Sequence, residues 1–246
     1  MGAALRFLTI LPVPGRHRPP GAAALLGFPL VGALVGAMWV AVLAADGLLP
    51  VPVLAALVLV ADAVLTGGLH LDAIADVADG AASRRRGDDA VEVMRDPAVG
   101  AGGALALALV CLVRWSALVG FGGLARGGEA LALMAAPVTG RVAMVLLLAL
   151  VPARPDGSLA AALARPRGAV VAGTAGIAAC VCVLAGRGGL AGGALAGLAA
   201  GAAVAPLWAG WWRRRFGNLS GDGVGAGGLI AETVALLVLS GLAARR

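Results

Sequence analysis

Seven apolar runs, each close to the length that crosses a lipid bilayer, follow one another along this chain of 246 residues. A membrane-spanning helix needs roughly 20 mostly apolar residues, because its backbone polar groups must bond within the segment. Only 13% of the residues are charged, against roughly a quarter in soluble domains. We therefore predict one all-α integral membrane domain over residues 1–246, a helical bundle with six or seven transmembrane helices. The runs cover about residues 22–45, 48–69, 98–120, 129–151, 168–186, 189–210 and 224–243.

The arginines between these runs predict the orientation of the chain in the membrane. One side of the predicted bundle receives Arg16, Arg18, Arg84, Arg85, Arg86, Arg95, Arg154, Arg165, Arg167 and Arg213 to Arg215, whereas the other receives Arg126, Arg187, Arg245 and Arg246. Cytoplasmic loops carry an excess of basic residues. The N-terminus is therefore predicted to be cytoplasmic, in a multi-pass protein of the bacterial cell membrane. The last two arginines fit a seventh span poorly, and a broken or re-entrant final segment would leave six.

The formal net charge of +6 does not by itself indicate a nucleic-acid partner. No aromatic residues interleave with the basic runs, so stacking on bases has no support. Arginines beside membrane spans set topology and contact anionic lipid. We expect membrane lipid as a partner and no nucleic acid, and the sequence leaves open whether the chain forms a homo-oligomer.

Local composition adds two expectations about packing. The apolar stretch from Leu5 to Val13 is too short to span a bilayer, so we expect an interfacial or re-entrant segment. Glycine is frequent within the runs, often at a spacing of four, as at Gly32 and Gly36. Small residues at this spacing let helices approach closely in lipid.

A row of carboxylates follows the second run. Asp72, Asp76 and Asp79 lie at i, i+4 and i+7, so on a helix they share one face. Like charges this close repel one another, and charges at a membrane boundary cost free energy. A divalent cation explains why they are kept together, and Mg²⁺ prefers oxygen ligands, usually combined with phosphates. We expect the chemistry here, in a cytoplasmic acidic and Arg-rich loop over about residues 70–97.

Part of this row forms a short motif, D-x-x-D-G-x-x-[AS]-R, from Asp76 to Arg84. Gly80 allows close approach of backbone or ligand, and Arg84 is suited to bidentate contact with a phosphate. The motif resembles the opening of the CDP-alcohol phosphotransferase signature, which continues with a glycine and two further aspartates. Here Glu92 and Asp96 have the right mutual spacing, but Asp88 stands where the glycine is expected. The likeness indicates a shared type of chemistry more than membership of the CDP-alcohol phosphotransferase family.

A fuller resemblance runs the length of the chain. The stretches that carry it are Arg6 to Pro14, Thr66 to Asp72 with Ala75 to Gly80, Met94 to Ala101, Ala136 to Arg141, and Gly221 to Ala226 followed by Glu232. The most specific is G-G-L-H-x-D with its later D-x-x-D-G. In order and approximate spacing these stretches resemble the cobalamin synthase family, the adenosylcobinamide-GDP ribazoletransferases.

That resemblance implies an Mg²⁺-dependent phosphotransferase of late cobalamin biosynthesis. α-Ribazole or its 5′-phosphate would attack adenosylcobinamide-GDP, and the products would be adenosylcobalamin or its 5′-phosphate and GMP. Such transfers need positioning, a bridging metal ion and a base for the incoming hydroxyl. In this interpretation the metal ligands are Asp72, Asp76 and Asp79. The catalytic residues are Asp96, the candidate base, together with Asp79 and His70. The residues expected to bind substrate and phosphate are Arg84, Arg95, Arg141, Asp222 and Glu232.

Each of several residues also has a structural interpretation. Asp96 precedes Pro97, a common way to begin a helix. His70 is suited to substrate binding, to a hydrogen bond with an aspartate, or to capping a turn. Arg141 lies inside a predicted span, where a charge usually faces the bundle interior and pairs with an acid. Glu232 is one such partner, and Asp222 lies among glycines that also suit a flexible linker.

Two further charges inside the predicted spans have no predicted catalytic role. Asp62 is a lone carboxylate two turns before the acidic row. Arg114 is expected to extend toward the membrane interface or to pack on the ring of Trp115.

Three other functions compete with this interpretation. Intramembrane charges and glycine-interrupted helices suit an ion-coupled secondary transporter, but the carboxylates cluster at one edge and no repeat relates the two halves. A CDP-alcohol-type phosphotransferase of phospholipid synthesis would require the complete signature. A structural membrane subunit would leave the acidic row without a purpose.

Overall fold

The computed structural model describes residues 1–14, 21–121, 128–155, 159–163 and 165–245, and Arg16, Arg18, Arg126 and Arg246 lie outside them. Apart from two isolated bridges, the regular elements in these ranges are helical. The helices are α1 (Gly2–Leu8), η1 (Ala22–Gly27), α2 (Phe28–Leu43), α3 (Val51–Thr66), α4 (Leu69–Ala82), α5 (Asp88–Met94), α6 (Ala101–Val119), η3 (Gly128–Met134), α7 (Ala135–Leu150), α8 (Leu159–Ala162), α9 (Gly168–Ala185), η4 (Gly186–Gly188), α10 (Ala191–Arg215) and α11 (Gly221–Ala243).

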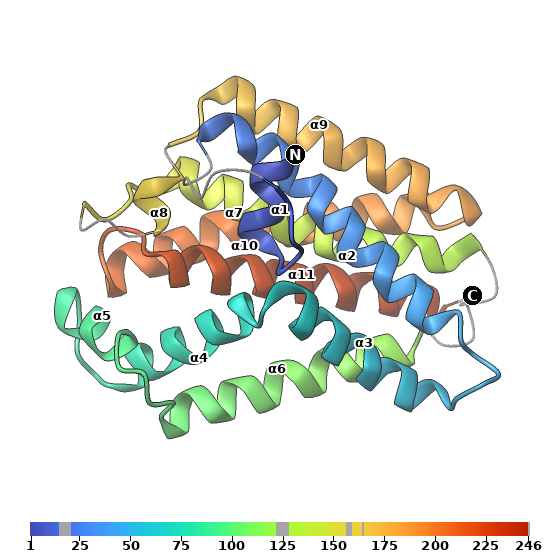
Figure 1. Cartoon of the computed structure of the whole chain (residues 1–246), viewed down its shortest axis with the longest axis horizontal. Coiled ribbons are helices and arrows are strands. Elements are labelled where there is room, and N and C mark those ends of the chain that lie inside the picture. Colours follow the sequence, from blue (N-terminus) through green and yellow to red (C-terminus); the bar gives the residue numbers. More distant parts are fainter. Residues whose placement is uncertain (15–20, 122–127, 156–158, 164, 246) are drawn as a thin grey trace.

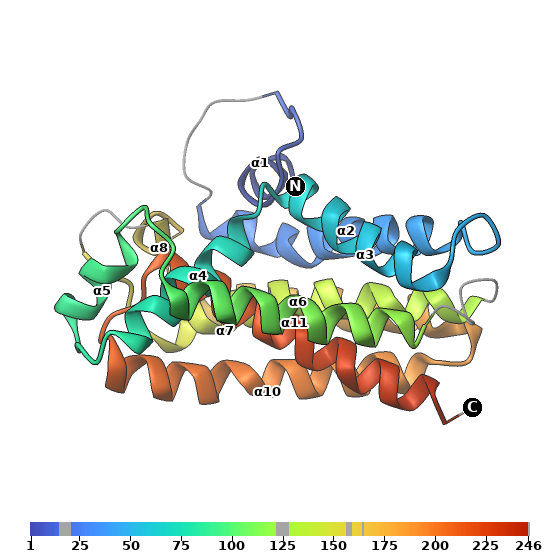
Figure 2. The same cartoon turned by 90° about the horizontal axis from the view of Figure 1, so that it is seen from below.

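The predicted all-α membrane bundle is confirmed. Within the described residues, six segments are long and apolar enough to cross a membrane, and a bent pair makes up to seven. Figure 1 shows α9 along one edge and α4 and α6 along the opposite edge, with α7, α10 and α11 between them. Figure 2 shows α2 and α10 on opposite faces. The segment that ends in α7 is the central one, since 83% of it is buried.

The bent pair consists of α3 and α4, which meet at an angle of 92°. The sequence predicted one span over residues 48–69 and then a loop, but the chain stays helical on both sides of a sharp break. Gly67 and Gly68 lie at the break with φ of 65° and 70°. Glycine adopts this left-handed conformation without a Cβ penalty. The acidic row is therefore carried by a helix, α4, which agrees with the helical spacing of Asp72, Asp76 and Asp79.

The N-terminal segment covers this break. α1 has seven residues and is too short to cross a bilayer. Its Ala4 and Leu8 are buried, and the backbone N–H of Ile10 donates to the carbonyl of Leu65 at 2.9 Å. The segment thus satisfies a carbonyl at the end of α3, and the prediction of a segment that does not span is confirmed.

Small residues bring the central helices together, as the glycine spacing predicted. A Cβ on Gly32 of α2 would lie 2.6 Å from the carbonyl oxygen of Pro137 in α7. A Cβ on Gly140 of α7 would lie 2.9 Å from the carbonyl oxygen of Gly228 in α11. Both distances are below normal contact, so only glycine permits these crossings.

The two ends of the bundle differ in charge. Figures 1 and 2 place α5 and α8 at one end and the C-terminus at the other. The α5 and α8 end carries the segments 83–100, 151–155, 165–167 and 216–220, which hold most of the described arginines together with the last turn of α10. Arg187 and Arg245 lie toward the other end. The cytoplasmic location of the arginine-rich end stays a prediction.

Candidate active site

The acidic row lies along one side of α4. Ala73, Val77 and Gly80 recur at helical spacing and are buried, because α4 packs between α6 and α11. The aspartates follow the same spacing on a more exposed side, where Asp72 is exposed and Asp76 is half-buried. The predicted common face of these carboxylates is therefore present, and α4 presents it at the edge of the bundle.

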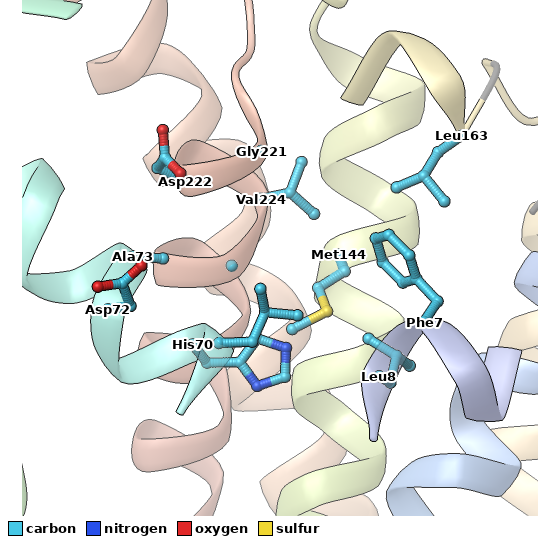
Figure 3. A pocket seen from close by; sticks show the side chains of 12 residues that line it. Phe7, Leu8, His70, Asp72, Ala73, Met144, Leu163, Gly221, Asp222 and Val224 are labelled. Atoms are coloured by element: carbon cyan, nitrogen blue, oxygen red, sulfur yellow. The ribbon is translucent and has the colours of Figure 1, made fainter. Parts of the chain in front are cut away.

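A fourth carboxylate reaches this row from the start of α11. Ser220 caps α11 by accepting a hydrogen bond from the N–H of Gly223 at 3.2 Å, and its hydroxyl lies 3.2 Å from Asp222 Oδ2. Figure 3 shows the side chains of Asp72 and Asp222 on the same side of the pocket, from α4 and α11. The crossing depends on Gly225, where a Cβ would lie 2.9 Å from Ala73 Cβ. Asp222 thus belongs to the row rather than to a flexible linker.

Asp79 differs from the other carboxylates because both of its oxygens have backbone partners. Oδ2 accepts from Gly100 N at 2.7 Å and Oδ1 accepts from Gly103 N at 2.8 Å. These N–H groups belong to the first turn of α6 and have no partner within the helix. A Cβ at Gly100 or Gly103 would lie 2.5 Å from an Asp79 oxygen, so the glycines permit the contact. Asp79 caps α6 from the neighbouring helix.

The carboxylates fit a divalent cation by their chemistry but are not gathered around one point. Among the described residues, no group of three or more His, Cys, Asp or Glu side chains is placed to hold a metal ion. Burial, followed by the negative charges of Asp72, Asp222 and Asp79, raises the pKa of Asp76 to about 6. Carboxylate oxygens are ligands that Mg²⁺ prefers. With Asp79 engaged by α6, the carboxylates of the row that fit the ion by their chemistry are Asp72, Asp76 and Asp222.

A pocket adjoins the row and extends toward α1, α7 and α8 (Figure 3). Its volume of about 60 Å³ exceeds the roughly 10–15 Å³ that one water needs, and suits a phosphate-sized group better than a nucleotide. His70 is 4% exposed, and in Figure 3 it lies between the two carboxylates, Asp72 and Asp222, and the apolar side chains of α1. The pocket is lined by Phe7, Leu8, Leu69, His70, Asp72, Ala73, Met144, Leu163, Gly221, Asp222, Val224 and Gly225.

Two of the predicted phosphate-binding arginines lie near the row. Arg84 follows α4 directly, is exposed, and has φ of 59°, a conformation that costs a non-glycine residue about 1 kcal/mol. Arg95 forms an ion pair with Glu92 at 3.4 Å, and its charge acts on Asp222. Both arginines therefore lie at the arginine-rich end, and Arg95 is close enough to Asp222 for its charge to act on that carboxylate.

One positioning residue was missed by the sequence interpretation, which assigned Arg213 to Arg215 to topology alone. Arg215 donates to the carbonyl of Ala81 at 2.7 Å, and its own carbonyl accepts from Gly87 N at 3.0 Å. It thus ties the end of α10 to the end of α4 and to the loop that carries Arg84. Basic residues commonly satisfy the last carbonyls of a helix, but the sequence could not identify which helix.

Asp96 does not begin a helix. Its Oδ1 accepts from Ala98 N at 2.9 Å, but α6 starts only at Ala101 with Gly100 as its N-cap. The structural alternative for Asp96 is therefore wrong, since the cap is supplied by Asp79 instead. Asp96 is exposed in the segment that joins α5 to α6, next to the glycine that Asp79 binds.

Arg141 and Glu232 lie inside the bundle and pair with each other. Arg141 of α7 forms an ion pair with Glu232 of α11, and both side chains are 1% exposed. Glu232 also pairs with Arg114 at 2.8 Å, which in turn pairs with Asp62 at 3.0 Å. Neither predicted substrate-binding residue lines the pocket of Figure 3. The structure shows the alternative that we left open, an internal ion pair.

The place of Arg114 was predicted incorrectly. It is 1% exposed rather than extended to the interface, and its guanidinium lies 5.1 Å from the ring centre of Trp39, not over Trp115. Asp62 gains a role as its partner. Four charges from α3, α6, α7 and α11 thus form a chain of three ion pairs, balanced in sign, in the interior of the bundle.

Comparisons with known proteins agree with the resemblance seen in the motifs. The model of a family described as cobalamin-5-phosphate synthase matches residues 1–240. Three relatives are each called adenosylcobinamide-GDP ribazoletransferase. The protein from Roseiflexus sp. is 38% identical, over 98% of this chain and 88% of its own. Those from Chlorobaculum parvum and Chlorobaculum tepidum are 37% and 39% identical, over 97% and 96% of this chain and 95% and 92% of theirs.

No solved structure matches the chain. The family match covers nearly the whole sequence, including the acidic row, the segment of Asp96 and the start of α11. On this evidence the chain belongs to the cobalamin-5-phosphate synthase family.

Proposed function

We propose that this protein joins adenosylcobinamide-GDP to α-ribazole or its 5′-phosphate. The ribazole hydroxyl oxygen forms a bond to the cobinamide-linked phosphorus, the bond from that phosphorus to the oxygen of GMP breaks, and the hydroxyl proton passes to a base. The products are adenosylcobalamin or its 5′-phosphate and GMP. The observation that supports this reaction is the position of Asp222, at the start of α11, on the same side as Asp72 and the acidic row of α4, in a chain that belongs to this family.

The residues divide into those that touch phosphates and those that position them. Bound Mg²⁺ supplies neutralisation of phosphate charge, and Asp72, Asp76 and Asp222 are the side chains that would hold it. Arg84 and Arg95, exposed at the same end, neutralise phosphate charge. Asp96 is the candidate base for the ribazole hydroxyl. His70 lies in the pocket as a substrate contact.

Arg141, Glu232 and Asp79 act differently in this proposal. Arg141 and Glu232 hold α7 to α11, and so fix the helix that presents Asp222. Asp79 holds the start of α6 against α4, and so places the segment with Asp96. These are positioning residues, since they act through the groups that contact substrate.

The arginine-rich end faces the cytoplasm in this proposal, in the cell membrane of a bacterium. The positive-inside rule supports this orientation, as does the chemistry, because a nucleotide-linked substrate is a soluble cytoplasmic molecule. The comparisons lend no support to a CDP-alcohol phosphotransferase or to a secondary transporter.

The test is a reaction in membranes that contain the protein. Adenosylcobinamide-GDP and α-ribazole are supplied with Mg²⁺ or with a chelator, and GMP and cobalamin are quantified. We expect product only with Mg²⁺, and a loss of about 100-fold or more for Asp76→Asn. Asp89→Asn is the matched control, because Asp89 is exposed on α5 outside the row, and it should retain activity. Product formation that resists chelation would disprove the metal assignment, and no product at all would disprove the function.

A further inference from the structure

Another cavity lies at the arginine-rich end of the bundle and shares no residue with the pocket of Figure 3. Its volume is about 420 Å³, and its lining comprises Leu150, Pro152, Arg165, Arg213, Gly217 and Asn218. It lies where α7 and α10 end, and among the described residues its lining includes two arginines and no carboxylate. Within the part of the chain that the structure describes, the lining of this cavity is therefore positively charged.

One of these guanidinium groups is held in place. Arg165 donates from Nε and Nη2 to the carbonyl of Ala149, at 3.2 and 3.0 Å. This contact fixes the plane of the group at the end of α7. Its remaining N–H donors are oriented before any ligand arrives, which lowers the entropy cost of binding.

The second guanidinium group has no partner of its own. Arg213, in the last turn of α10, is exposed and makes no hydrogen bond or ion pair with the residues that the structure describes. Arginine binds phosphate oxygens with two parallel hydrogen bonds. Asn218 adds an amide to the same lining. These groups together are suited to a phosphate.

The level of the cavity relative to the membrane indicates which phosphate-bearing molecule it would meet. Trp208 and Trp211 pack with tilted rings whose centres are 4.7 Å apart, and Trp212 and Phe216 with tilted rings whose centres are 4.5 Å apart, all at the end of α10. Trp211 is 39% exposed. Tryptophans gather at the level of lipid headgroups, with basic residues beyond them. Arg213 directly follows Trp211 and Trp212, which indicates that the cavity lies at headgroup depth.

We propose that this cavity binds the phosphate of an anionic membrane phospholipid, with Arg165 and Arg213 as its charged contacts. The bound lipid would lie next to the segment that leads to the active site. Leu219 N donates to the carbonyl of Pro152 at 2.8 Å, and Arg154 N donates to the carbonyl of Leu219 at 3.0 Å. Leu219 is followed by the cap of α11 and by Asp222, so a lipid here supports the helix start that presents a predicted metal ligand.

The experiment measures lipid binding to purified full-length protein in detergent by native mass spectrometry. The probes are phosphatidylglycerol and phosphatidylcholine, and the variants are Arg213→Gln and Arg214→Gln. Arg214 is the matched control, because it is the next residue, is exposed, and does not line the cavity. We expect tighter binding of phosphatidylglycerol, a Kd raised about tenfold by Arg213→Gln, and a change below about twofold for Arg214→Gln.

Two results would overturn the proposal. Equal weakening by both variants would show a diffuse electrostatic attraction instead of a site. Displacement of the lipid by millimolar GMP or inorganic phosphate, with the same dependence on Arg213, would show that the cavity takes a soluble phosphate. Arg213 and Arg214 are both exposed, so both variants should melt, without added lipid, at the same temperature as the unmodified protein.

Discussion

At the scale of single residues, the aspartates of one helix have different tasks despite their regular spacing. Asp76 is surrounded by like charges, as a metal ligand would be before the ion binds. Asp79 is saturated by two backbone N–H groups of α6. The spacing of the row is the same for both, but only Asp79 faces the start of another helix.

This difference predicts separable effects on the metal. Asp79→Ala should destabilise the protein by about 1–2 kcal/mol, because two N–H groups of α6 lose their acceptor. It should lower activity while the Mg²⁺ concentration for half-maximal activity changes by less than about twofold. Asp76→Ala should raise that concentration by about tenfold or more. Titration of Mg²⁺ against product formation checks both, and a tenfold rise for Asp79→Ala would identify it as a ligand after all.

At the scale of elements, the break between α3 and α4 decides where the acidic row is presented. An unbroken helix from Val51 to Ala82 would carry the aspartates along the direction of α3. The turn of 92° at Gly67 and Gly68 instead lays α4 against α6 and α11. The left-handed φ at both positions is the local reason for that turn.

Replacing either glycine with alanine should therefore destabilise the protein, and the loss should be larger at Gly67 than at Gly68. A Cβ on Gly68 would meet nothing within 4 Å, so Gly68→Ala should cost about 1–2 kcal/mol of backbone strain. A Cβ on Gly67 would in addition lie 3.0 Å from Ile10, so Gly67→Ala should cost more. Gly176→Ala is the control, since Gly176 lies within α9 with open space around it, and it should be neutral or stabilising. Thermal unfolding in detergent measures all three, and equal melting temperatures would refute the strain argument.

At the scale of the whole molecule, four buried charges join helices that are far apart in sequence. Asp62, Arg114, Glu232 and Arg141 lie on four helices and balance in sign. In lipid the network replaces the polar contacts that water would give, and it ties the broken span to the central helices. Removal of one member leaves an uncompensated buried charge, which is costly.

A double-mutant cycle tests this network. Asp62→Asn and Arg114→Gln should each destabilise the protein by about 3–5 kcal/mol, and the double variant should lose clearly less than the sum, because it restores charge balance. Asp88→Asn is the control, since it breaks the exposed ion pair with Arg154 and should cost less than about 1 kcal/mol. Chemical denaturation in mild detergent provides the free energies. Additive losses in the double variant would show that the two charges act independently.

Much of the candidate site could be predicted from the sequence because it is local. The spacing of Asp72 and Asp76 predicts a shared helical face, and both lie on α4. The motif order predicts the family, which the comparisons confirm. Arg84 and Arg95 lie at the end of the bundle that the row approaches. Each of these conclusions needs only the periodicity of one helix or the order of motifs along the chain.

The class of fold follows from the sequence alone, since runs of about 20 apolar residues leave a chain in lipid few alternatives to crossing helices. Which charges pair with one another, in contrast, depends on how the helices pack. Arg141 pairs with Glu232, which lies 91 positions further along the chain, and Asp79 accepts a hydrogen bond from Gly100, which lies 21 positions further along. These contacts depend on which faces of separate helices come together, and glycines such as Gly225 set that by how closely they let the helices approach. Periodicity within one segment carries no information about the neighbour that the segment will face.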